Sequence, residues 1–179
     1  MNNKSYGNLI NKDGNGRYTK STDTETVLSY ILRKNGQSDA DLIAWGGLGI
    51  LEYGNAEYAI HQFCLVHQQH TRRGNFGRYL SHEIFSFSNE GESVISAYNL
   101  DIDTIARQMA RDIYEKDHCQ VVYGVHAPDG EDAHLHIHFA VNAVCYNTGN
   151  KRRENMRQTK EREERFQKII ADEISGNSL

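Results

Sequence analysis

The sequence predicts a single α+β domain in which helices pack on a central antiparallel β-sheet. The main sign is a pair of strand-like segments, 120–126 and 133–144, separated by a short acidic turn that folds the chain back. The second sign is helical periodicity at 101–117 and 153–174, on either side of that pair. A length of 179 residues, with 38% hydrophobic and 25% charged side chains, fits one domain with one core.

The N-terminal part is expected to contain little regular secondary structure. Its first 22 residues are polar and rich in glycine, with room for one short strand. Asp23 or Thr24 can cap a helix that ends at Asn35-Gly36. The segments that follow are a short strand at 42–45, a glycine-rich turn, a helix over 55–69 and a basic loop at 71–78.

The C-terminal part is expected to be more regular. A strand-like run at 80–87 ends at Asn89-Glu90-Gly91. Asp101 or Asp103 opens a helix with one apolar side, and the two paired strands come after it. The core of the domain is therefore expected over about 24–148, and 149–179 form a charged terminal helix with a buried stripe of Phe166, Ile169 and Ile170.

Composition excludes several classes of protein. No run of about 18 apolar residues predicts a membrane span, and the first residues lack the apolar stretch of a secretory signal. Three widely spaced cysteines fit neither a CxxC metal site nor a disulfide framework, which favours a reducing cytoplasm. The net charge of −4 means that any binding of nucleic acid must rest on local features.

The most informative segment is 125–142, which holds four of the nine histidines. Alternate side chains of a strand share a face, so His134, His136, His138 and Asn142 point one way, opposite the apolar side chains between them. His126 ends the preceding strand and is expected to return beside His136 and His138. Three imidazoles on adjacent strands, with coordination positions left open, predict a catalytic metal site, with His134 as the spare ligand. The alternative is a solvated polar face, on which such clustered imidazoles repel one another once protonated.

Other features carry weaker functional signals. Arg72, Arg73 and Arg78, with aromatic side chains nearby, form either a surface for phosphates and bases or a solvated loop. The pair His82-Glu83 does not extend to the HExxH pattern of zinc proteases, because position 86 is Ser. Residue type alone selects none of the ten tyrosines as a nucleophile.

Three segments, in this order, resemble the motifs of MobP-type conjugative relaxases, which are HUH endonucleases related to the T-DNA border endonuclease. Residues 30–36, Tyr-Ile-Leu-Arg-Lys-Asn-Gly, resemble the family's tyrosine motif on an early helix. Residues 82–90 resemble its His-x-x-x-Ser-Phe motif, and residues 126–142 resemble its His-x-Asp-loop-His-x-His motif, which ends in Asn. This chain departs from the pattern after His126, where the loop is longer and the acid comes three positions on, at Asp129.

The resemblance implies an HUH relaxase-like palm and a metal-dependent nicking endonuclease. Tyr30 would attack a phosphodiester of single-stranded DNA at an origin of transfer, forming a 5′-phosphotyrosine link that can later be rejoined. A divalent cation on His126, His136 and His138 would neutralise the developing charge. The resemblance implies Mg²⁺ or Mn²⁺, whereas imidazole ligands also admit Zn²⁺ or Ni²⁺ in a crystal.

The resemblance also implies supporting residues and partners. One acid of the loop (Asp129, Glu131 or Asp132) would fix the tautomer of a ligating imidazole. The side chains expected to hold DNA or to orient Tyr30 are His82, Ser86, Arg72, Arg73, Arg78 and Asn142. Because the chain is acidic overall, an accessory relaxosome protein is expected to share DNA binding. A coupling protein is a further expected partner, and binding to a membrane is not expected.

Three alternatives stay open. A rolling-circle replication initiator shares the histidine hairpin but places its tyrosine after it, and here that residue would be Tyr146. A cupin-type metal barrel would use His136 and His138, but the glutamate it needs a few residues later is absent and the helix content is too high. A non-catalytic module with a vestigial site would bind DNA without forming a covalent adduct.

Overall fold

A five-stranded antiparallel sheet with the order β1-β3-β5-β4-β2 forms the centre of the molecule. The computed structural model describes residues 5–12, 18–34, 41–51, 56–70, 77–128 and 134–177. The predicted pair of late strands is confirmed, because β4 and β5 are neighbours with His126 opposite His136. The strands are β1 (Gly7–Asn11), β2 (Leu42–Leu48), β3 (Leu80–Phe87), β4 (Cys119–His126) and β5 (His136–Cys145).

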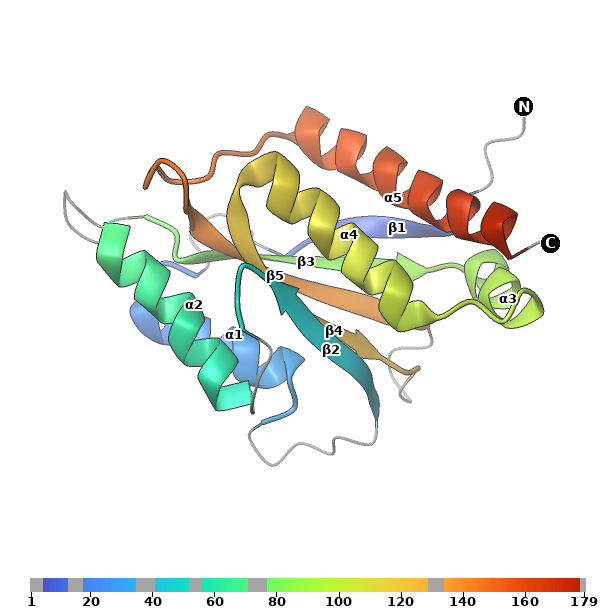
Figure 1. Cartoon of the computed structure of the whole chain (residues 1–179), viewed down its shortest axis with the longest axis horizontal. Coiled ribbons are helices and arrows are strands. Elements are labelled where there is room, and N and C mark those ends of the chain that lie inside the picture. The colour runs from blue at the N-terminus through green and yellow to red at the C-terminus, as the bar shows by residue number, and fades with distance from the viewer. Residues whose placement is uncertain are drawn as a thin grey trace.

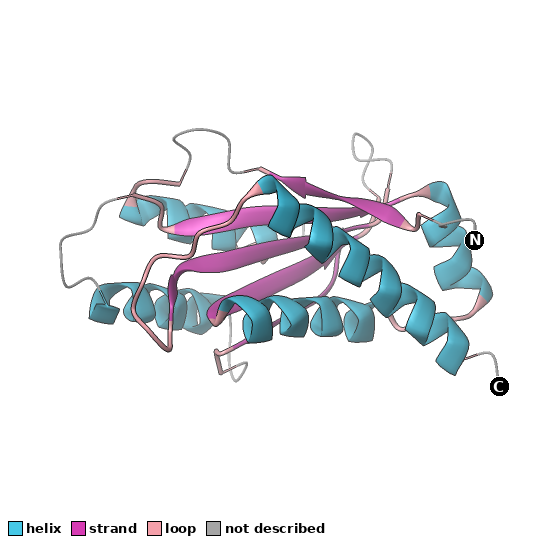
Figure 2. Ribbon diagram, turned by 90° about the horizontal axis from the view of Figure 1, so that it is seen from above, coloured by secondary structure: helices cyan, strands magenta, loops and turns pink. Residues whose placement is uncertain are grey.

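Helices cover both faces of this sheet, which confirms the α+β class (Figure 1, Figure 2). One face packs against α4 (Ile102–Asp117) and α5 (Met156–Gly176), and the other packs against α1 (Ser21–Ile31) and α2 (Ala56–His70). The short helix α3 (Asn89–Ala97) follows β3 at one end of the sheet. Among the helices of the described residues, none is long and apolar enough to cross a membrane.

The larger apolar core lies between the sheet and the α4–α5 layer. Ile137, Phe139 and Val141 of β5 point into it, as the alternation along this strand predicts. The Phe166 ring of α5 lies 5.6 Å from the Phe139 ring, measured between centroids. The apolar side of α4 lies on the same core, through Ile105, Ala106, Met109, Ala110 and Ile113.

A buried group of charges attaches α5 to the sheet. Arg162 of α5 is 2% exposed and its Nη1 donates to Glu83 Oε2 of β3 at 2.6 Å. Arg152 donates to Glu83 Oε1 at 3.0 Å and to Asp117 Oδ2 at 2.7 Å. Burial opposes the charge of Glu83, but the two arginines outweigh it and hold the pKa of this carboxyl below its usual value. These two arginines therefore stabilise the fold and are not available to bind DNA.

Several elements differ from the sequence prediction. The glycine-rich turn expected after residue 45 is part of β2, where Gly46 lies against the Tyr123 ring and a Cβ would come within 2.7 Å of the phenol oxygen. The helix α3 was not predicted, because Gly91 breaks its pattern. Gly91 is needed there because a Cβ would come within 2.0 Å of the Tyr6 carbonyl oxygen. The last strand begins at His136, three positions later than predicted. Residue 133 itself lies outside the described residues.

Candidate metal centre and nucleophile

Three histidines from two neighbouring strands converge on the α1–α2 side of the sheet. His126 ends β4, and His136 and His138 begin β5. One nitrogen of each ring lies within 4.8 Å of those of the other two rings, and all three side chains are buried. Because zinc–nitrogen bonds are about 2.0–2.1 Å long, nitrogen atoms up to 4.8 Å apart would move slightly closer to bind one cation together.

In two of these rings, the hydrogen bonds leave a lone pair open for a cation. His136 Nδ1 lies 2.8 Å from the His134 carbonyl oxygen and must donate to it, which leaves the lone pair on Nε2. His138 Nε2 is buried and has no hydrogen-bond partner among the described residues. Burial lowers the pKa of His126 and holds that of His138 well below its usual value, with the charges of neighbouring rings adding to the effect. A free imidazole lone pair is what binds metal, so Nε2 of His136 and Nε2 of His138 can each bind a divalent cation.

A glycine lets α1 approach the histidines closely. Gly124 lies on β4, opposite His138. A Cβ at this position would come within 2.7 Å of the Ile31 carbonyl oxygen and within 3.4 Å of His126 Nε2. His126 Nε2 donates to that same carbonyl at 2.8 Å. The end of α1 is therefore in direct contact with the histidine cluster.

Tyr30 lies in the last turn of α1 and faces the cluster. Its ring centroid lies 5.4 Å from that of His138, 6.2 Å from His126 and 6.5 Å from His82. The side chain is partly exposed, at 36%. The phenol thus stands beside the candidate ligands and is open to solvent, which is the arrangement that attack on an external phosphodiester needs.

Arg33 links the tyrosine to the histidine cluster, a contact that the sequence did not reveal. Its guanidinium carbon lies 4.8 Å from the centre of the Tyr30 ring, and its Nη2 donates to His126 Nδ1 at 2.9 Å. Asp41 accepts from Arg33 Nε at 3.1 Å. Burial opposes the charge of Arg33, but its hydrogen bonds to Asp41 and Tyr30 outweigh this and raise its pKa. A cation that binds His126 at Nδ1 would replace the hydrogen bond from Arg33.

The two predicted site residues of β3, His82 and Ser86, lie next to the cluster but differ in environment. His82 is 6% exposed, and its Nε2 lies 3.0 Å from His138 Nδ1. Burial lowers the pKa of His82 to about 4. Ser86 is half-buried and pairs with His136 across the sheet. His82 therefore contacts a candidate ligand from behind, whereas Ser86 lies beside another.

Other predicted site residues lie away from the cluster. His134 Nδ1 faces Glu92 Oε1 at 3.3 Å, outside the ligand group. Arg78 is exposed and donates to Ser81 Oγ at 3.2 Å. Asn142 is fully buried and its amide donates to the Phe63 carbonyl at 3.0 Å, so it connects β5 to α2 and is not open to a DNA strand. The predicted residues that lie outside the described part of the chain are Arg72, Arg73, Asp129, Glu131 and Asp132.

Tyr146, the alternative nucleophile, lies beyond the opposite end of β5. It follows Cys145, eight positions after His138, which corresponds to about 27 Å along an extended strand. Its ring stacks on Tyr114 at a centroid distance of 5.0 Å. The structure therefore brings Tyr30, and not Tyr146, to the histidines.

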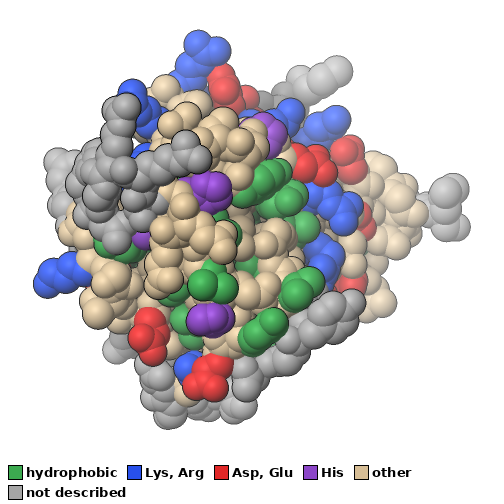
Figure 3. Space-filling model, turned by 60° about the vertical axis from the view of Figure 1, so that its left-hand side comes forward, with side chains coloured by type: hydrophobic (Ala, Val, Ile, Leu, Met, Phe, Trp, Pro, Cys, Tyr) green, Lys and Arg blue, Asp and Glu red, His purple; other side chains and the backbone are tan. Residues whose placement is uncertain are grey.

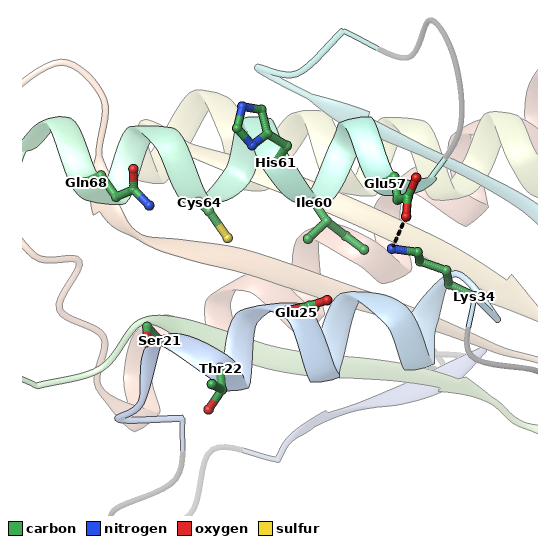
Figure 4. A pocket seen from close by; sticks show the side chains of 9 residues that line it. All are labelled: Ser21, Thr22, Glu25, Lys34, Glu57, Ile60, His61, Cys64 and Gln68. Carbon is green, nitrogen blue, oxygen red and sulfur yellow. Dashed lines mark ion pairs between the residues drawn. The ribbon is translucent and has the colours of Figure 1, made fainter.

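A groove of about 450 Å³ between α1 and α2 is separate from the histidine cluster (Figure 4). At one end Lys34 Nζ pairs with Glu57 Oε1 at 3.0 Å. With Glu25 also in the lining, the groove is poorly suited to a phosphate backbone. The described side chains of the face in Figure 3 likewise mix both signs of charge around hydrophobic side chains and histidines.

Comparison with known proteins agrees with this geometry. The family model described as relaxase, MobA/VirD2-like, nuclease domain, matches residues 30–174. Among solved structures, the chain is similar to the conjugative relaxase TrwC in complex with oriT DNA in a metal-bound form. The TM-score is 0.51 and the identity is 15%, with 96% of this chain and 68% of that chain covered, so this likeness shows the fold. No curated protein sequence matches. Since the family match spans most of the chain, this protein belongs to the MobA/VirD2-like relaxases, which are conjugative relaxases of the HUH type.

Proposed function

We propose that this domain nicks single-stranded DNA at an origin of transfer by transesterification, in the mobilisation of a plasmid or an integrative element. The Tyr30 oxygen attacks the scissile phosphorus, and the bond from phosphorus to the 3′ oxygen breaks. The products are a 5′-phosphotyrosine link and a free 3′-hydroxyl. Because the ester conserves the phosphodiester bond energy, the same residue can later rejoin the strand. The observation that carries this proposal is the phenol of Tyr30 beside three buried histidines.

The chain's own residues supply positioning and charge. His126, His136 and His138 would hold a divalent cation, for which Mg²⁺ or Mn²⁺ is proposed as the ion in the cell. When bound, this ion neutralises charge on the phosphate. Arg33 lies over the Tyr30 ring and adds a fixed positive charge beside the phenol. Together these groups would place positive charge beside both the nucleophile and the anionic substrate.

The proposal includes partners, because the chain carries a net charge of −4. Arg152 and Arg162, which add to the basic count, are buried in ion pairs with Glu83. Sustained contact with a DNA backbone therefore calls for help from an accessory relaxosome DNA-binding protein. We place the reaction in the cytoplasm, with a coupling protein that receives the DNA-linked domain.

A covalent-adduct assay tests the nucleophile. The wild-type protein, incubated with an origin oligonucleotide and Mn²⁺, is expected to form a denaturation-resistant adduct carrying the 5′ phosphate. Tyr30→Phe is expected to lower adduct formation at least about a thousandfold, because the attacking oxygen is lost. Tyr146→Phe is the matched control and is expected to leave the adduct unchanged.

The remaining outcomes identify the alternatives. An adduct that depends on Tyr146 would indicate a rolling-circle initiator. A gel shift without any adduct would indicate a non-catalytic DNA-binding module. An adduct that survives removal of divalent metal by a chelator would contradict the role given to the three histidines.

A further inference from the structure

Two polar side chains, His82 and Tyr18, form a chain of contacts behind the candidate ligand His138. His82 Nε2 lies 3.0 Å from His138 Nδ1, and the Tyr18 hydroxyl lies 3.2 Å from His82 Nδ1. His82 and His138 are 6% and 2% exposed. The chain therefore runs from the cluster through β3 to the segment that precedes α1.

The available hydrogen-bond partners favour one arrangement of protons on His82 and His138. If His82 donated to His138, then His138 Nε2 would carry a proton, and this buried N–H has no acceptor among the described residues. If His138 Nδ1 donates instead, Nε2 keeps its lone pair and His82 Nε2 accepts. His82 Nδ1–H then donates to the Tyr18 oxygen, so every ring N–H of the chain has an acceptor.

The backbone of Tyr18 supports a dedicated role for this residue. It has a φ of 56°, a left-handed conformation that costs energy for a residue with a side chain. Its carbonyl accepts from Tyr79 N at 2.8 Å, next to the start of β3. The surroundings thus hold Tyr18 in an unfavourable conformation in which its hydroxyl meets His82.

We propose that His82, oriented by Tyr18, is a positioning residue that keeps His138 in the Nδ1–H tautomer, so that Nε2 is free to bind the cation. This inference rests on the proposed function for the presence of the cation. A neutral imidazole does here what a carboxylate often does for a metal-bound histidine. It adds no negative charge next to an anionic DNA phosphate.

The tautomer can be measured without metal. Long-range ¹H–¹⁵N spectra of the metal-free protein are expected to show His138 protonated at Nδ1. His82→Leu removes the acceptor, and His138 is expected to shift to the Nε2–H form. His82→Gln places an amide oxygen near the former Nε2 and is expected to restore the Nδ1–H form. Tyr18→Phe removes the acceptor for His82 Nδ1–H and is expected to raise the Nε2–H share at His138, whereas the exposed Tyr98→Phe is the control without effect.

Metal affinity gives the second readout. With Mn²⁺ as the probe, His82→Leu is expected to weaken binding about 10–100-fold, whereas His82→Gln stays within about threefold of wild type. Equal affinities for the Leu and Gln variants, or an unchanged His138 tautomer in both His82→Leu and Tyr18→Phe, would overturn the proposal. These measurements involve no DNA, so a chain that passes them but forms no Tyr30 adduct would refute the proposed function and leave this inference standing.

Discussion

The two faces of β5 are both buried, yet they carry different chemistry. Ile137 and Phe139 point towards α4 and α5, where they meet other apolar side chains. His136 and His138, their neighbours in sequence, point towards α1, where they meet His126 and the ring of Tyr30. Burial alone therefore does not distinguish core from site. What distinguishes them is the polar ring atoms that only one face carries, including His138 Nε2, which is buried without a hydrogen-bond partner among the described residues.

Truncating adjacent residues on the opposite faces of β5 tests whether the two faces have different roles. Phe139→Ala is expected to lower the free energy of unfolding by about 3–5 kcal/mol, because it leaves a cavity beside Phe166. His138→Ala is expected to lower the free energy of unfolding of the metal-free protein by less, about 1–2 kcal/mol, because it removes one buried hydrogen bond to His82, but to abolish tight Mn²⁺ binding. Denaturant unfolding and a metal titration of both variants check this. Similar losses of stability in the two would contradict the division of roles.

The buried charges next to the apolar core test a different kind of stabilisation. Glu83→Gln is expected to cost about 3 kcal/mol of unfolding free energy, since it leaves Arg152 and Arg162 without their shared carboxylate. Lys168→Gln is the control, because its ion pair with Asp172 is exposed and contributes little. Thermal unfolding at neutral pH measures both.

The buried ion pairs of Glu83 also predict that the free energy of unfolding falls at acid pH. The folded-state pKa of Glu83 lies below its ordinary value of 4.5, so the unfolded chain binds the proton more readily. The stabilisation by this carboxylate is therefore present above about pH 4.5 and is lost as the pH falls towards the folded-state pKa. Unfolding curves of wild type and Glu83→Gln between pH 7 and 3 are expected to converge as the pH falls. Curves that stay parallel would contradict this assignment.

The smallest expected effect concerns the contact between α1 and the sheet. Gly124→Ala is expected to cost about 1–3 kcal/mol, because its Cβ would meet the Ile31 carbonyl and push the end of α1 outward. Adduct formation through Tyr30 should fall more steeply than Mn²⁺ affinity. Gly176→Ala is the matched control, since a Cβ there meets nothing within 4 Å. Equal losses of both activities would show that α1 and the hairpin respond as one unit.

Sequence patterns revealed the parts of this protein in which neighbours along the chain share a role. Alternation in β5 predicted its apolar face and the convergence of His136 and His138 with His126, which the structure confirms. The role of Tyr30 as the nucleophile rested on resemblance, because its ring lies on an ordinary amphipathic helix. That role remains a prediction.

Other features depend on contacts between distant segments and left no periodic signal. Tyr18 and Arg33 reach the histidines from positions with left-handed backbone, which no residue pattern marks. Arg162 lies on the charged terminal helix outside its predicted apolar stripe, and its burial left no signal because its partner Glu83 is 79 positions away. The hydrogen bond from Asn142 to the Phe63 carbonyl of α2 likewise left no signal in the sequence.

The candidate ligands belong to one hairpin, whereas Tyr30 arrives on a separate helix that rests on the sheet through Leu28 and Ile31. Movement of that helix would therefore separate the Tyr30 ring from the three histidines while the hairpin kept the histidines together.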